Sequence, residues 1–132
     1  QEAVAPEPLR EFRGVWVATV ANIDWPTSRT AGVAEQRAEM VKILDAARAA
    51  NFNAVVFQAR PCCDAMYKSS LEPWSEFLTG ESGKAPLGDF DPLAEWVAAA
   101  HERGMELHAW VNPFRARHFD EKKPAAIKDC AR

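Results

Sequence analysis

Three short apolar segments constrain the fold of this chain more than any other feature. They span residues 12–20 (FRGVWVATV), 53–59 (NAVVFQA) and 105–111 (MELHAWV), and they are rich in β-branched and aromatic side chains. Continuous apolar runs of this length are typical of strands that are covered on both faces. The sequence therefore predicts three buried strands.

Helical patterns separate the strands. A first helix is predicted over residues 33–50, and a second helix begins at Asp91-Pro92 and ends at Gly104. Asp can cap a helix N-terminus, Pro fits the first helical turn, and Gly commonly follows the last turn. The apolar positions of the first helix have the spacing of one helix face: Val33, Met40, Val41, Leu44 and Ala47.

The order of these segments predicts an α/β fold with parallel strands joined by right-handed helical crossovers. It fits a doubly wound sheet as well as a (β/α)8 barrel, and periodicity alone does not choose between them. Residues 60–90 contain Pro, Ser and Gly with little periodicity. Connections of this length without regular structure are usually functional or disordered.

The composition excludes several function classes. The net charge of −3 and the pI of about 5.6 give no electrostatic reason to expect nucleic acid or an anionic membrane as partner. No run reaches the roughly 18 to 20 apolar residues of a membrane-spanning helix. No glycine-rich loop follows the first strand and no GxSxG motif is present, so neither a nucleotide cofactor nor a nucleophile elbow is predicted.

The N-terminal residues 1–10 are predicted to be a flexible lead-in to a domain over residues 11–132. The chain begins at Gln1, and the stretch QEAVAPEPL is rich in Ala, Pro and Glu. This start fits an exported protein whose signal peptide has been removed, and it fits equally a boundary within a longer protein.

The cysteines leave their own bonding state open and predict no metal site. Cys62 and Cys63 are adjacent, and a disulfide between neighbours is strained. Cys130 could pair only if the C-terminal tail folded back. With no CxxC motif and no His beside the adjacent pair, a zinc site is not predicted.

Polar and aromatic side chains follow all three predicted strands. In parallel α/β folds the carboxyl ends of the strands form the ligand site. Aromatic rings can lie against the C–H faces of a pyranose, while amides, carboxylates and guanidinium groups bind its hydroxyls. Sugar is therefore the predicted ligand class, on the residues Asp24, Trp25, Gln58, Arg60, Asp64, Trp74, Trp110, Asn112 and Arg115.

Several of these positions also have a structural interpretation. Trp16, within a strand, and Trp96, on an apolar helix face, are predicted to pack in the core. Trp25 fits a core position and a sugar site about equally, and Trp110 fits an inward-facing layer of a barrel. His108 is central in a strand, where a hydrogen-bonded core histidine is the usual outcome.

Three ordered blocks of the sequence resemble a known family. They are RGVWVATVANIDWP at residues 13–26, NAVVFQARP followed by DAMYKSSLEPWSEFLTG within residues 53–80, and DPLAEWVAAAHERGMELHAWVNPFRAR at residues 91–117. Together they resemble the glycosyl-hydrolase-like family 10 domain of bacterial envelope proteins, over about residues 12–124. The adjacent cysteines depart from the small or hydroxyl residues usual in that family.

The resemblance implies a (β/α)8 barrel, an extracytoplasmic location and hydrolysis of a glycan, with peptidoglycan strands as the expected substrate. A full barrel takes about 250 residues. Residues 11–132 are therefore predicted to be its N-terminal portion, with three strands and two helices. The residues that the resemblance places along the sugar cleft are Asp24, Gln58, Arg60, Asp64, Tyr67, Trp74, Trp110, Asn112 and Arg115.

Glycoside hydrolysis generally needs two carboxyl groups that flank the bond. In relatives, the expected catalytic acids follow the fourth and later strands. Within this chain Asp24 and Asp64 are the catalytic candidates, with Glu72 a weaker one. The alternative is a non-catalytic or degenerate glycan-binding module. Because an open sheet leaves edges and faces uncovered, self-association of this portion is also predicted.

Overall fold

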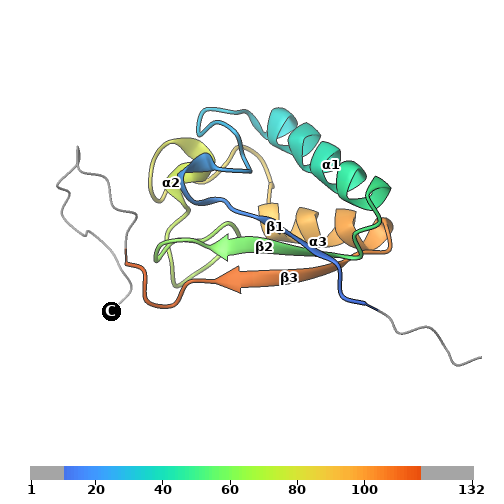
Figure 1. Ribbon diagram of the computed structural model, residues 1–132. Coiled ribbons are helices and arrows are strands. Elements are labelled where there is room, and N and C mark those ends of the chain that lie inside the picture. Colours follow the sequence, from blue (N-terminus) through green and yellow to red (C-terminus); the bar gives the residue numbers. More distant parts are fainter. Residues whose placement is uncertain (1–10, 117–132) are drawn as a thin grey trace, which may run out of the picture.

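Three parallel strands form one sheet in the order β1 (Gly14–Val17), β2 (Ala54–Arg60) and β3 (Glu106–Val111). The computed structural model describes residues 11–116 of the chain (Figure 1). The strands lie close to the predicted segments, and their parallel pairing confirms the predicted α/β class. The carboxyl ends of all three strands therefore lie at one edge of the sheet.

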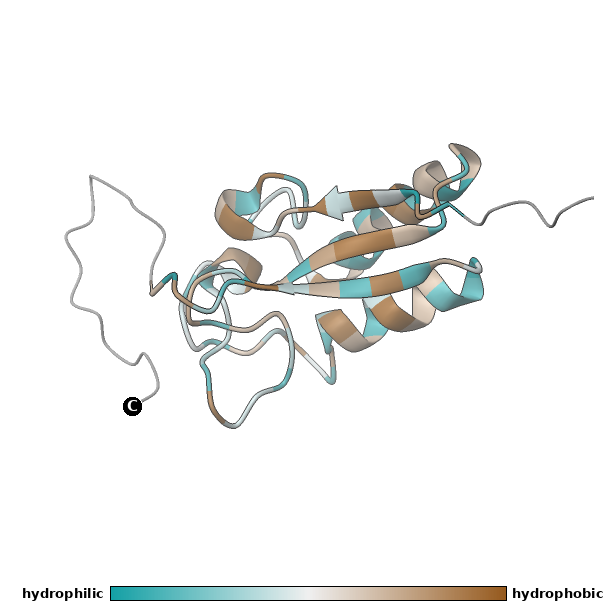
Figure 2. Cartoon of the chain, turned by 60° about the horizontal axis from the view of Figure 1, so that its bottom comes forward, coloured by the Kyte–Doolittle hydropathy of each residue, from teal (hydrophilic) through white to brown (hydrophobic). Residues whose placement is uncertain are grey.

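The two long helices, α1 (Val33–Ala49) and α3 (Pro92–Glu102), cover the same side of the sheet. Figures 1 and 2 show no helix against the other side, which we call the helix-free face. Both helices begin close to the predicted residues. The Asp91 carboxylate accepts a hydrogen bond from the Ala94 backbone N–H at 3.2 Å, so the predicted N-terminal cap of α3 is confirmed.

Two short elements were not predicted. The first strand ends at Val17, earlier than expected, because the chain turns into a 3₁₀ helix, η1 (Val20–Asn22), in which Ala21 and Asn22 have φ near +55°. The second is α2 (Glu76–Thr79), within the long connection between β2 and α3. Its boundaries have ordinary sequence signals: the Ser75 side chain caps its N-terminus, and Gly80, with φ of 84°, ends it.

The hydrophobic core lies between the helices and the sheet. The Phe57 ring of β2 stacks on the Trp96 indole of α3, with ring centroids 4.9 Å apart and an interplanar angle of 26°. Leu44 of α1 is also fully buried, and Trp96 thus confirms its predicted core role. Val41 remains exposed, so the predicted apolar face of α1 is narrower than its spacing indicated.

The core position predicted for Trp16 is wrong. Trp16 is 60% exposed, because its side chain lies on the helix-free face and not on the side that the helices cover. It meets Trp110 edge to face, with ring centroids 5.0 Å apart. His108 has a hydrogen-bonding partner as expected, Glu106 at 2.9 Å, but its side chain is about half exposed and not in the core.

The strand order is shared by two architectures. A (β/α)8 barrel and one half of a doubly wound sheet both have consecutive parallel strands with their crossover helices on one side. Three strands do not close a barrel, so the barrel remains a prediction. Within residues 11–116, no helix is long and apolar enough to cross a membrane.

Candidate functional site

The carboxyl ends of β2 and β3 are joined by hydrogen bonds that involve predicted site residues. The Asn112 backbone N–H donates to the Arg60 carbonyl at 3.0 Å. The Arg60 Nη1 donates in turn to the Asn112 carbonyl at 2.6 Å. Two residues that are 52 positions apart in sequence are thus held together at the predicted edge of the sheet.

Arg60 is the centre of this edge, and its side chain is largely buried. Its Nε donates to Glu72 Oε1 at 2.5 Å, and its Nη2 lies 3.4 Å from Cys63 Sγ. The hydrogen bond that Arg60 donates to Glu72 is the main cause that raises the Arg60 pKa, so the guanidinium stays charged. All three nitrogens of Arg60 therefore have partners within the chain, and Arg60 holds neighbouring loops in place instead of offering a free cation.

Asp64 is a buried carboxyl group beside this network. Its side chain accepts a hydrogen bond from the Cys62 backbone N–H at 2.7 Å and another from the Ser75 hydroxyl. The Asp64 pKa is raised to about 6: burial is the main cause and nearby Glu76 contributes, while the hydrogen bonds from Ser75 and Cys62 and the charge of Arg60 act in the opposite direction. A carboxyl group with such a pKa exchanges protons near neutral pH, which suits acid–base chemistry.

The second catalytic candidate lies elsewhere. Asp24 is exposed, and its Oδ2 accepts a hydrogen bond from the Ala18 backbone N–H at 2.8 Å, which closes the turn after β1. Within residues 11–116 no hydrogen bond joins Asp24 to Asp64 or to Arg60. The structure therefore does not bring the two predicted catalytic carboxylates together as a hydrogen-bonded pair.

Trp25 is a core residue, so the substrate-binding role predicted for it is wrong. Its side chain is fully buried, and its indole N–H donates to the Gln36 carbonyl at 2.9 Å. The ring meets Phe57 and Trp96, with centroids 5.7 and 5.5 Å away. The turn at η1 places this side chain in the core between the sheet and the helices, where no sugar can reach the faces of the ring.

Gln58 is buried, and its side chain accepts hydrogen bonds from the backbone of the turn after β1. Its Oε1 accepts hydrogen bonds from the backbone N–H groups of Thr19 and Val20, both at 2.9 Å. Its Nε2 is also buried, and it has no hydrogen-bonding partner within residues 11–116. Gln58 lies opposite Trp110 in the sheet register, so this amide stands next to the half-buried Trp110 at the end of the helix-free face.

Tyr67 and Trp74 lie in the connection after β2. Both are partly buried and pack against the core. The backbone pairs Ala65 with Trp74 in an isolated parallel bridge, and the Ala65 N–H donates to the Pro73 carbonyl at 2.9 Å. This part of residues 60–90 is therefore folded onto the sheet, and each of the two rings offers only part of its surface to a ligand.

Arg115 and Cys62 meet where the segments after β3 and β2 come together. The Arg115 backbone N–H donates to Asn112 Oδ1 at 3.2 Å, and its side chain forms a hydrogen bond with Cys62. Burial raises the Cys62 pKa to about 11, with Asp64 contributing, so this thiol is protonated at neutral pH. Cys62 and Cys63 are free in the described part of the chain; Cys130 lies outside the described residues.

The sequence did not predict the structural roles of three residues at this edge, one of which, Glu72, was only a weaker catalytic candidate. Cys63 and Glu72 surround Arg60, and Ser75 hydrogen-bonds Asp64. Only Ser75 has a recognisable signal, since it stands at the start of a short helix. The other two depend on how an aperiodic connection folds.

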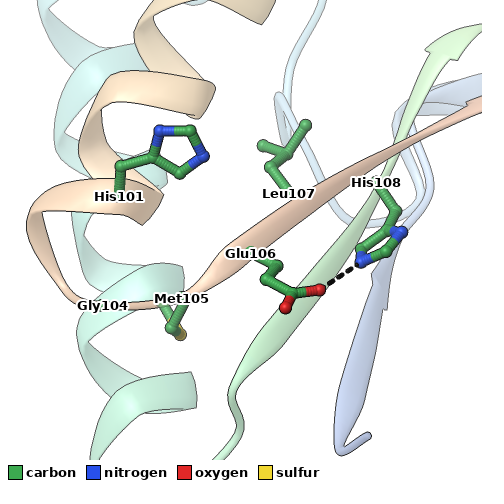
Figure 3. Close-up of a pocket in the computed structure, with 6 residues that line it drawn as sticks. All are labelled: His101, Gly104, Met105, Glu106, Leu107 and His108. Carbon is green, nitrogen blue, oxygen red and sulfur yellow. Dashed lines mark hydrogen bonds and ion pairs between the residues drawn. The ribbon is translucent and has the colours of Figure 1, made fainter.

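A surface hollow of about 440 Å³ lies at the opposite end of β3. Figure 3 shows it between the end of α3 and the first residues of β3, lined by His101, Gly104, Met105, Glu106, Leu107 and His108. None of the predicted site residues lines it. Within the described part of the chain, no cluster of three or more His, Cys, Asp or Glu side chains is placed to hold a metal ion.

Comparison with known proteins gives one consistent result. Residues 11–128 match the family model described as glycosyl hydrolase-like 10. The chain is 48% identical over 116 residues to the glycosyl hydrolase YngK of Bacillus subtilis, and 34% identical over 134 residues to the glycosyl hydrolase DigH of Escherichia coli. These alignments cover 86% and 96% of this chain, but only 22% and 30% of the relatives, so the chain spans less than a third of each.

Proposed function

Because the chain belongs to the glycosyl hydrolase-like 10 family, we propose that it forms part of the glycan-binding cleft of a protein that hydrolyses glycosidic bonds. The observation that carries this proposal is the convergence of Arg60, Asp64, Asn112 and Arg115 at the carboxyl edge of a parallel sheet. This is the edge at which α/β proteins bind their ligands. Carbohydrate is the substrate class that the family suggests.

The described residues divide into two roles in this proposal. Arg60 and Gln58 position the loops, because their polar atoms are mainly engaged with backbone and side-chain partners. Asn112 and Arg115 are partly exposed and are the residues proposed to exchange hydrogen bonds with a bound glycan, while Asp64 is buried. Trp74 and Trp110 keep part of their rings accessible for contact with sugar faces.

Asp64 is the stronger of the two catalytic candidates in this chain. It is buried, its pKa is raised to about 6, and a general acid needs a carboxyl group that remains protonated close to working pH. The second carboxyl group that hydrolysis requires would come from later strands of the complete protein. Asp24 stabilises the turn after β1 and fits a structural role better.

We further propose a (β/α)8 barrel for the complete protein, peptidoglycan glycan strands as substrate, and a location outside the cytoplasm. The barrel is supported by the consecutive strand order, with both long helices on one side of the sheet. The substrate and the location rest on the resemblance of the sequence to envelope proteins. No nucleotide cofactor or metal ion enters the proposed chemistry.

A non-catalytic glycan-binding module is the competing candidate. One observation favours it: among the described carboxylates at this edge, Glu72 is bound to Arg60 and Asp24 to a backbone N–H, which leaves Asp64 as the one catalytic candidate here.

The test is to incubate the complete protein with denuded peptidoglycan strands, which lack their peptides, and to measure new reducing ends beside a pull-down on the same material. Release of new ends that is lost in Asp64→Asn supports hydrolysis with a role for Asp64. Binding without release supports the non-catalytic module. Absence of both would overturn the proposed function.

A further inference from the structure

The most exposed large apolar side chain in the described part of the chain stands at the proposed cleft. Phe114 is 95% exposed and lies three residues beyond the end of β3. Residues 112–116 follow the β3 arrowhead in Figure 1, on the side where the connection after β2 also lies. Within them, Asn112 and Arg115 are already part of the candidate site.

The backbone around Phe114 is held at both ends. On one side, Asn112 exchanges hydrogen bonds with Arg60, through its N–H at 3.0 Å and its carbonyl at 2.6 Å. On the other side, the Arg115 N–H donates to Asn112 Oδ1 at 3.2 Å, and its side chain contacts Cys62. The ring is therefore carried by a short turn whose backbone is fixed to β2.

An exposed ring on a fixed stretch of backbone is suited to one kind of contact. The C–H groups on one face of a pyranose pack against the π-face of an aromatic ring. The hydroxyl groups around the same sugar need polar partners, and the Asn112 amide and the Arg115 guanidinium lie one or two residues away. These two requirements of a sugar meet within four consecutive residues.

We propose that Phe114 is a stacking platform for a pyranose ring of the glycan, with Asn112 and Arg115 binding the hydroxyls of the same sugar unit. This inference rests on the proposed function and adds to it a binding residue at the end of β3. Phe114 contacts the substrate without taking part in bond cleavage. Its contribution is to hold one sugar unit at the β3 side of the cleft.

The competing explanation is that later parts of the complete protein bury Phe114 in a hydrophobic interface. The two explanations differ in which substitution they tolerate. Stacking needs a ring, so Tyr can replace Phe and Leu cannot. Burial needs an apolar side chain of similar size, so Leu is tolerated, while Tyr would bury a hydroxyl group that lacks a partner.

The experiment uses the complete protein and soluble, denuded peptidoglycan glycan strands as the probe. Affinity and melting temperature are measured for the wild type and for Phe114→Ala, Phe114→Tyr and Phe114→Leu. Leu87→Ala is the matched control, because Leu87 is 85% exposed in the connection that precedes α3 and carries no ring. We expect the Ala and Leu variants to bind roughly 3- to 10-fold more weakly, and the Tyr variant to bind within about 2-fold of the wild type.

The outcomes separate the platform from the proposed function. If the wild type binds glycan and Phe114→Leu binds equally well, the platform is overturned, and a lowered melting temperature of Phe114→Tyr would identify burial instead. Equal affinity of all variants overturns it as well. If the wild type neither binds nor cleaves the strands, the proposed function fails and the platform fails with it. An unchanged Leu87→Ala affinity shows that the loss is specific to the ring at position 114.

Discussion

Gln58 holds Thr19 from two directions. The Thr19 backbone N–H donates to Gln58 Oε1 at 2.9 Å, and the Thr19 hydroxyl donates to the Gln58 carbonyl at 2.8 Å. Both residues are fully buried. The pair fixes the start of the turn after β1 to the end of β2.

The first prediction concerns this pair. Gln58→Leu leaves the N–H groups of Thr19 and Val20 buried without an acceptor, so the free energy of unfolding should fall by about 2–4 kcal/mol. Thr19→Val is the control; it removes only the hydroxyl donor and should cost about 1 kcal/mol. Denaturant unfolding of the complete protein measures both. Equal costs for the two variants would contradict the acceptor role of Gln58.

The second prediction tests Arg60 as a positioning residue. Arg60→Lys keeps the charge but cannot reach Glu72, Asn112 and Cys63 together, so it should destabilise the protein by about 2 kcal/mol. A double-mutant cycle with Glu72→Gln measures the coupling between the two side chains. The same cycle on the more exposed pair Arg37 and Glu95 is the control and should give a smaller coupling energy.

If Arg60 instead bound the glycan directly, Arg60→Lys would weaken affinity while leaving the unfolding transition unchanged. A loss of stability together with a proportionate loss of affinity supports the positioning role.

The sequence was sufficient for the elements whose stability is local. The pattern of residues 33–50 predicted α1, and the Asp91-Pro92 start predicted α3, because caps and apolar spacing act within one helix. The three strands were predicted from continuous apolar runs, which are also a local pattern. Their parallel pairing followed from the helical crossovers between them.

The site was predicted less completely, because its contacts join distant residues. The burial of Trp25 depends on left-handed backbone at Ala21 and Asn22, and Ala in that conformation gives no sequence signal. The engagement of Arg60 depends on Glu72, which lies in a connection without periodicity. The sequence was sufficient to predict that polar residues follow the strands. It was not sufficient to predict which of these residues form hydrogen bonds within the chain and which remain available to a ligand.

The third prediction concerns the Asp64 carboxyl group. Its pKa is about 6 in the folded protein against an ordinary value of 3.8, so the folded state retains the proton more strongly than the unfolded state. Protonated Asp64 therefore contributes its full stabilisation below about pH 4, and this contribution is lost as the pH rises through about 6. Over this range the free energy of unfolding should fall by up to about 3 kcal/mol.

Asp64→Asn should remove this dependence, because the amide does not ionise and keeps an oxygen for the Cys62 N–H. The measurement is the difference in unfolding free energy between the two proteins from pH 4 to pH 8. Glu35→Gln, at an exposed position on α1, serves as the control for the loss of one carboxylate charge. A wild-type-minus-variant difference that does not vary with pH would show that Asp64 titrates normally.

The last prediction uses the helix-free face to test the proposed barrel. Phe12 and Trp16 are 61% and 60% exposed on the described part of the chain, and a closed barrel would bury Trp16 in its interior. Trp16→Lys should therefore affect the isolated segment and the complete protein differently. In residues 11–132 produced alone, it should reduce self-association, because it places a charge on an exposed apolar face. In the complete protein it should lower the melting temperature sharply, because it buries an unpaired charge.

Sedimentation of the segment and thermal unfolding of the complete protein measure the two effects. If the complete protein tolerates Trp16→Lys without loss of stability, Trp16 faces solvent there too, and later strands do not close over this face.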